Sequence, residues 1–111
     1  MVNSFFIDAT GSMSDEQIES ALEKYTSLQK LGDYAIVFNE FQFIRTLNTL
    51  FAGAIARDRV RIDGRYAPQG ARYFNWLNRT LELTKKTNRI LITDGYIHDE
   101  LLKKFNQVIR V

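Results

Sequence analysis

The fold is decided near the start of the chain, at residues 2–14, which read VNSFFIDATGSMS. An apolar run that ends at Ile7 is followed at once by polar and small residues, as expected where a buried strand meets a loop. Ser14 stands three residues before Gln17, which is the spacing of a helix capping box, and two acidic residues follow Ser14 in the first turn. The stretch therefore predicts a strand, a polar loop and the start of a helix.

The rest of the chain continues the same alternation of strands and helices. Apolar residues at helical spacing and short apolar runs bounded by glycine, asparagine and aspartate mark the elements. We expect strands at 2–7, 34–38, 41–44, 90–92 and 108–111, and helices at 15–31, 47–56, 73–86 and 98–106. Gly32 is expected to end the first helix, and residues 57–69, with six charges, one glycine and the only proline, are expected to be mostly loop.

This order of elements predicts a single α/β domain over residues 1–111. We expect a three-layer, Rossmann-like, mostly parallel sheet with helices on both faces. The strands at 34–38 and 41–44 are separated only by Asn39 and Glu40, so a tight hairpin should make the second of them an antiparallel edge strand. The packing of the helix at 73–86 should leave it well buried.

Composition limits the classes of protein to consider. The 111 residues are 45% hydrophobic and 25% charged, as in globular proteins, and the net charge of +2 gives no indication of nucleic-acid binding. No apolar run approaches the roughly 20 residues that cross a bilayer. Without cysteine there is no disulfide framework, and the start of the chain lacks the features of a signal peptide, so we expect a cytoplasmic protein.

Two aspartates follow strands that we expect to be neighbours in the sheet. Asp8 ends the first strand, and Asp94 follows the strand at 90–92. If the first strand is central, the chain reverses its direction of growth between these two strands, and ligands of open α/β sheets bind beyond the carboxyl ends of the strands at such a point. Both carboxylates should then point into one crevice, where their repulsion calls for a proton, a metal ion or a cationic side chain.

Thr10 and Ser12 alternate with Asp8 in the loop, so that a bend can aim a carboxylate and two hydroxyls at one point. These hard oxygen ligands suit Mg²⁺ or Mn²⁺.

Two segments resemble the von Willebrand factor type A family. Residues 5–17, FFIDATGSMSDEQ, look like the first motif of its metal-ion-dependent adhesion site, and residues 90–95, ILITDG, look like the strand that carries its last metal-site aspartate. The resemblance follows the order of the chain, which would be a compact version of bacterial or phage type. It implies that the metal ligands are Asp8, Thr10, Ser12 and Asp94. It also implies a non-catalytic module in which the ion presents an open coordination position to a carboxylate on a partner protein.

The middle loop of the site departs from the family pattern. Gly70, Arg72 and Tyr73 stand in the segment that resembles this loop, with arginine where the family usually has threonine. Arginine does not coordinate a cation, but its guanidinium can pair with a carboxylate and replace the charge of the metal. The site is thus degenerate, and a metal-free adaptor held by Arg72 stays open beside the metal-dependent one.

Other interpretations of these residues remain. Asp8 and Ser12 are also favoured as turn and capping residues between a strand and a helix. A metal-dependent phosphoryl hydrolase would use the same two aspartates, but we see no second acidic cluster for it. The single histidine, His98, is expected to begin a helix. The sequence gives no indication of the oligomeric state or of the partner.

Overall fold

The computed structural model describes residues 1–39, 43–57 and 71–111, and it describes the side chains of all of these except residues 43 and 71–76. The helices and strands follow one another along the chain in the predicted order. The strands are β1 (Asn3–Asp8), β2 (Tyr34–Phe38), β3 (Phe43–Thr46), β4 (Asn88–Thr93) and β5 (Gln107–Arg110). The helices are α1 (Asp15–Leu28), α2 (Thr49–Arg57), α3 (Ala71–Leu83) and α4 (Asp99–Leu102).

The five strands form one sheet in the order β3-β2-β1-β4-β5. β1 is central and pairs in parallel with both β2 and β4, β5 pairs in parallel with β4, and β3 is the antiparallel edge strand beside β2. The predicted mostly parallel α/β sheet with one antiparallel edge strand is confirmed. β2 and β4 lie on opposite sides of β1. The sheet therefore grows in opposite directions from these two strands, as predicted.

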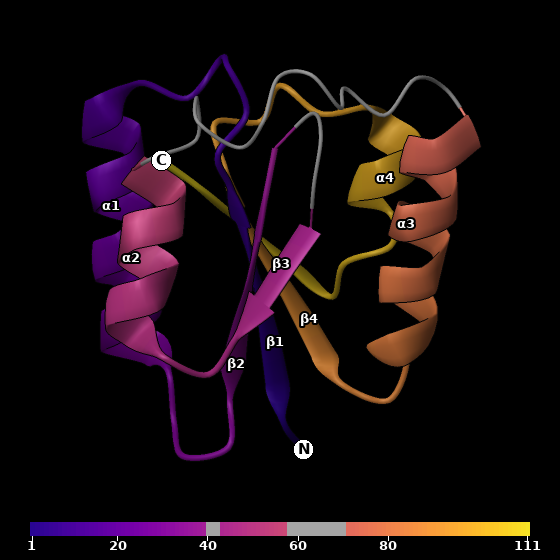
Figure 1. Ribbon diagram of the computed structural model, residues 1–111, viewed down its shortest axis with the longest axis horizontal. Coiled ribbons are helices and arrows are strands. Elements are labelled where there is room, and N and C mark those ends of the chain that lie inside the picture. The colour runs from indigo at the N-terminus through magenta and orange to yellow at the C-terminus, as the bar shows by residue number, and fades with distance from the viewer. Residues whose placement is uncertain (40–42, 58–70) are drawn as a thin grey trace.

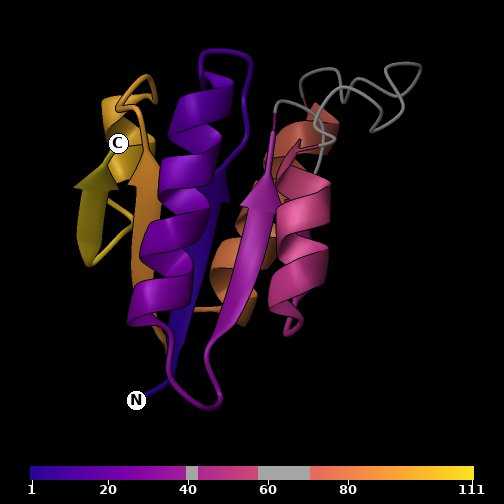
Figure 2. The same ribbon diagram turned by 90° about the vertical axis from the view of Figure 1, so that its left-hand side faces the viewer.

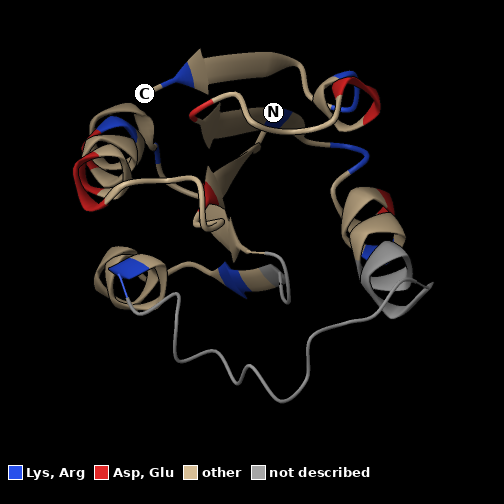
Figure 3. Cartoon of the chain, turned by 90° about the horizontal axis from the view of Figure 1, so that it is seen from above, with Lys and Arg blue, Asp and Glu red and all other residues tan. Residues whose placement is uncertain are grey.

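Helices cover both faces of the sheet (Figure 1). α1 and α2 lie on one face, where Figure 2 shows them in front of the strands, and α3 and α4 lie on the other. Seen along the strands in Figure 3, the sheet runs between these two pairs of helices. The arrangement is the three-layer, Rossmann-like one that the sequence predicts.

Each face of the sheet has its own apolar core because successive side chains of a strand point to opposite sides. Phe5 and Ile7 of β1 pack under α1 and α2, with Phe5 edge-on to Tyr25 at 5.2 Å between ring centroids. Phe6 faces the other way and packs edge-on against Phe105 at 4.9 Å. Residues Ser4 to Asp8 of β1 are all fully buried, so this strand fixes the position of whatever follows it.

The hairpin between β2 and β3 is only partly described. Phe38 pairs with Phe43 and Ala35 with Thr46, so the antiparallel pairing of the two strands is present, and β3 extends to Thr46, two residues beyond the predicted end at 44. Residues 40–42 lie outside the described residues, so the predicted tight connection at Asn39 and Glu40 and the predicted start of the second strand stay predictions.

Two helix ends also differ from the prediction. α1 ends at Leu28, and its cap Gln29 has an extended backbone, whereas Gly32 lies in the following turn with φ of 92°. His98 does begin α4, but this helix stops at Leu102 instead of 106. The chain leaves it there because the backbone N–H of Asn106 donates to the carbonyl of Arg89, which starts the approach of β5 to β4.

α3 begins and ends earlier than the predicted helix at 73–86. Thr84 closes it, since its hydroxyl donates to the carbonyl of Thr80 at 2.8 Å. Leu77 is buried as expected, but Leu83 is 68% exposed, so the prediction of a well-buried helix is wrong at this end. The predicted loop at 57–69 lies, beyond Arg57, outside the described residues.

Candidate functional site

Asp8 and Asp94 meet at the carboxyl ends of the two central parallel strands. Asp8 is the last residue of β1, and Asp94 directly follows β4. The hydroxyl of Thr93 links them, because Thr93 Oγ1 donates to Asp8 Oδ2 at 2.6 Å and lies 3.4 Å from Asp94 Oδ1. A hydroxyl has one proton to donate, so the shorter bond to Asp8 is the main one. The two carboxylates therefore lie close together at this edge, and a crevice shared by them stays a prediction.

The Asp8 carboxylate is fully buried. Its Oδ1 accepts a hydrogen bond from the backbone N–H of Thr10 at 2.8 Å. Burial raises the pKa of Asp8 above its usual value; hydrogen bonds from Thr10 and Thr93 counteract this only in part, and the charge of Asp94 adds to it. Within the described part of the chain, no lysine or arginine forms an ion pair with Asp8. The fold thus keeps a carboxylate away from water without a compensating cation among those residues.

Thr10 and Ser12 place their hydroxyls beside each other in the loop between β1 and α1. Thr10 Oγ1 and Ser12 Oγ lie 3.3 Å apart. Neighbouring oxygens around an octahedral Mg²⁺ with bonds of 2.0–2.1 Å lie about 3 Å apart, so this spacing fits a pair of adjacent ligands. The loop is held in place by the predicted capping box, in which Ser14 Oγ accepts from the backbone N–H of Gln17 at 3.1 Å and Gln17 Oε1 from that of Ser14 at 2.9 Å.

The turn after β4 fixes the second carboxylate. Asp94 Oδ1 accepts from the backbone N–H of Tyr96 at 3.0 Å, and the N–H of Gly95 donates to Thr93 Oγ1 at 3.1 Å. Gly95 has φ of 93°, which favours glycine. A Cβ at this position would also meet the guanidinium of Arg110, which would have to move aside, so the positive φ is the main reason for glycine in this turn.

Three residues at this edge were not predicted as site residues. Thr93 bonds Asp8, Arg110 of β5 lies over Gly95, and Asn39 follows β2 with its side chain buried. A signal for Thr93 and Asn39 existed, because both are polar and stand at the end of a buried strand. The sequence contains no signal for Arg110, because its position near Gly95 depends on the pairing of Thr93 with Arg110 across β4 and β5.

The predicted middle loop is only partly visible. Gly70 lies outside the described residues, and Arg72 and Tyr73 belong to the first turn of α3, where the backbone is described and the side chains are not. α3 begins at the upper end of the molecule in Figure 1, the end at which β1 and β4 finish. Whether Arg72 pairs with Asp8 or Asp94 therefore stays a prediction.

Two wider properties bear on the class of protein. Among the described residues, no group of three or more histidine and acidic side chains is arranged to hold a metal ion. A site here would have to draw on hydroxyls beside its two carboxylates. The described helices include none of the length and apolarity needed to span a membrane.

Comparison with known proteins adds no relative: no family model, no curated protein and no solved structure matches the chain. The fold and the edge just described define an α/β domain of Rossmann-like architecture.

Proposed function

We propose that the chain is a protein-binding module of von Willebrand factor A type, which holds a divalent cation at the carboxyl edge of its sheet. Asp8, Thr10, Ser12 and Asp94 would hold Mg²⁺ or Mn²⁺. When bound, the ion supplies positive charge and an open coordination position for a carboxylate on a partner protein. Such a module has no catalytic residues of its own.

The observation that carries the proposal is the state of Asp8. A carboxylate without exposure to water, facing a second carboxylate and lacking an ion pair among the described residues, costs free energy in an isolated domain. Each Asp8 oxygen accepts one hydrogen bond and has a further lone pair. A cation that uses these lone pairs would remove the cost.

The loop hydroxyls support the same interpretation. Turn or capping residues need only satisfy backbone groups, and Ser14 already caps α1. Thr10 and Ser12 are not needed for that cap, yet their hydroxyl oxygens lie at 3.3 Å, near the spacing of adjacent octahedral ligands. Oxygen donors of this type prefer Mg²⁺ or Mn²⁺ to softer ions.

A second candidate is a cation-free adaptor with the same fold. The position of the Arg110 guanidinium over Gly95, one residue from Asp94, favours it, because a guanidinium at this edge can balance the two carboxylates. Arg72 was predicted for that role. In this version the partner would meet a preformed surface, and added metal would change nothing.

Calorimetric titration of metal-stripped protein with Mg²⁺ and then Mn²⁺ tests the proposal. We expect saturable binding that is lost in Asp8→Asn and retained in Asp99→Asn, which removes an exposed aspartate of α4. Parent protein without binding would contradict the metal site and support the adaptor, in which case Arg72→Thr and Arg110→Gln should each be examined for newly acquired affinity. Metal-dependent hydrolysis of a phosphate ester that is lost in Asp8→Asn would instead show an enzyme.

A further inference from the structure

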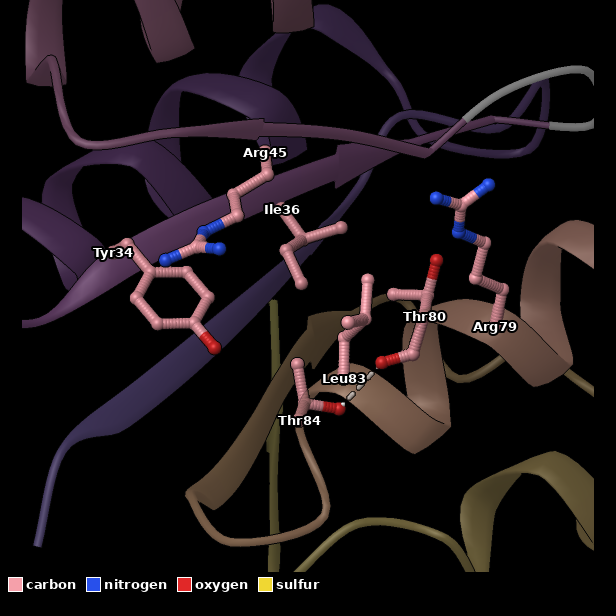
Figure 4. A pocket seen from close by; sticks show the side chains of 7 residues that line it. All are labelled: Tyr34, Ile36, Arg45, Arg79, Thr80, Leu83 and Thr84. Carbon is pink, nitrogen blue, oxygen red and sulfur yellow. Dashed lines mark hydrogen bonds between the residues drawn. The ribbon is translucent and has the colours of Figure 1, made fainter.

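A cavity lies on the opposite side of the sheet from α1 and α2. It has a volume of about 300 Å³ and lies between α3 and the strands β2 and β3. Its walls are formed by Tyr34, Ile36, Arg45, Arg79, Thr80, Leu83 and Thr84, which Figure 4 shows. The volume is at the lower end of the range for small-molecule sites.

The lining carries two positive charges and no negative one. Arg45 comes from β3 and Arg79 from α3, on facing walls (Figure 4). The Arg45 guanidinium lies 4.2 Å from the centre of the Tyr34 ring, in a cation–π contact that fixes its position. Neither arginine forms an ion pair with a described carboxylate. Both donor groups are therefore available to an anion.

The floor of the cavity combines an apolar surface with an unused hydroxyl. Tyr34 is only 6% exposed, and no described residue forms a hydrogen bond with its hydroxyl, which is directed into the cavity in Figure 4. Ile36 and Leu83 supply aliphatic surface beside the ring. The hydroxyl of Thr84 is engaged in the helix end, where it donates to Thr80 and accepts from Arg89. Tyr34 is thus the free polar group of the floor.

Protection of the sheet edge explains only part of this arrangement. A charged residue on an edge strand prevents pairing with another chain, which accounts for Arg45 on β3. It accounts neither for Arg79 on the facing helix nor for a tyrosine hydroxyl that is directed into the cavity and has no described hydrogen-bond partner. A ligand with an anionic group and an apolar body would satisfy all three.

We propose that this cavity binds a small organic anion, a carboxylate or phosphate attached to an aromatic or aliphatic group. The guanidinium of Arg45, held over the Tyr34 ring, would take the charged end, because guanidinium groups form paired hydrogen bonds with carboxylate and phosphate oxygens. Arg79, whose guanidinium lies apart from that of Arg45 in Figure 4, would add positive charge to the same cavity. Tyr34 and Leu83 would contact the apolar body. The site is separate from the Asp8 edge and does not depend on the metal.

Titration of ¹⁵N-labelled protein with phenyl phosphate and with benzoate tests this site. We expect saturable shifts of the amide signals of Tyr34, Arg45 and Thr84, with at least tenfold weaker binding of inorganic phosphate and of benzyl alcohol, which each retain one half of the ligand. Absence of binding, equal binding of inorganic phosphate, or shifts centred on Thr10 and Gly95 would each overturn the proposal.

Variants distinguish a specific binding site from a surface that attracts anions by its net charge alone. Arg45→Gln should weaken phenyl phosphate binding about tenfold or more, as expected for loss of hydrogen bonds to a charged group, and Arg79→Gln should weaken it severalfold. Tyr34→Phe keeps the ring and should weaken it severalfold. Arg57→Gln, which removes an exposed arginine from α2 on the other face, should bind like the parent. Equal effects of all three arginine variants would mean that only the net charge matters and would contradict the site.

Discussion

Two aspartates lie buried at opposite ends of the same sheet, and the fold treats them differently. Asp33, 6% exposed, precedes β2 at the amino end, and Asp8, fully buried, finishes β1 at the carboxyl end. Burial acts to raise the pKa of both carboxyls. The pKa of Asp33 is nevertheless lowered, whereas that of Asp8 remains raised.

The difference comes from their partners. Asp33 accepts three hydrogen bonds: from the backbone N–H of Asn3 at 2.9 Å, from its side-chain amide at 3.0 Å and from the N–H of Lys30 at 2.9 Å, and the charge of Lys30 assists. Among the described residues, Asp8 accepts two and faces Asp94. Asp33 is therefore a structural residue that joins α1, β1 and β2. No described residue forms an ion pair with the negative charge of Asp8, as expected of a binding site.

The largest effect should follow from removing the structural aspartate. Asp33→Ala leaves two backbone N–H groups and an amide without their acceptor, so the free energy of unfolding should fall by about 3 kcal/mol. Urea denaturation measures it, with Asp99→Ala as the control, which should stay within about 0.5 kcal/mol of the parent. A loss below about 1 kcal/mol for Asp33→Ala would contradict the structural role of Asp33.

A smaller loss should follow from removing the hydroxyl that supports Asp8. Thr93→Val keeps the shape but removes the donor to Asp8 and the acceptor of the Gly95 N–H, which should cost about 1–2 kcal/mol and raise the pKa of Asp8 further. Denaturation and carboxyl ¹³C titration measure the two effects. Thr26→Val, on the exposed side of α1, is the matched control and should change neither.

Asp8→Asn should change stability in the opposite direction. An amide can accept from the Thr10 N–H and donate to Thr93 Oγ1, and it removes a buried charge, so the metal-free variant should be about 1 kcal/mol more stable than the parent at pH 7. Asp33→Asn should be less stable than the parent. Denaturation of both variants in chelator provides the test, and destabilisation of similar size in both would show that Asp8 is structural too.

The two aspartates should also differ in the pH dependence of stability. The folded pKa of Asp8 lies above the ordinary 3.8, so the parent loses stability relative to Asp8→Asn as the pH rises through that folded pKa, and the difference disappears at low pH. The folded pKa of Asp33 lies below 3.8, so its contribution is present above 3.8 and is lost as the pH falls through the folded value. Denaturation of the parent and of the two Asn variants from pH 2 to pH 7 provides the test. As the pH rises, the parent should lose stability relative to Asp8→Asn and gain stability relative to Asp33→Asn. Stability differences that do not change with pH would contradict both assignments.

Much of the fold was predictable because local and tertiary signals agree. The apolar run before Asp8, the capping box at Ser14 and the alternation of elements led to the sheet, its central strand and the meeting of Asp8 with Asp94. These features depend on periodicity and on short-range hydrogen bonds, which a sequence displays directly.

Three of the missed features depend on contacts between segments far apart in the chain. Arg110 reaches Gly95 only because β5 pairs with β4 in one particular register. The cavity brings together Tyr34, Arg45 and Arg79 from β2, β3 and α3. The end of α4 is set by the approach of Asn106 to Arg89. No periodicity or motif encodes such pairings.

The most direct test of the central claim is paramagnetic broadening by Mn²⁺ of the amide signals of ¹⁵N-labelled, metal-stripped protein. We predict that substoichiometric Mn²⁺ broadens Thr10, Ser12 and Gly95 first, leaves Asn3 and Asp33 sharp, and has no such effect in Asp8→Asn. Broadening that is absent, or centred away from the carboxyl ends of β1 and β4, would contradict a cation site at Asp8.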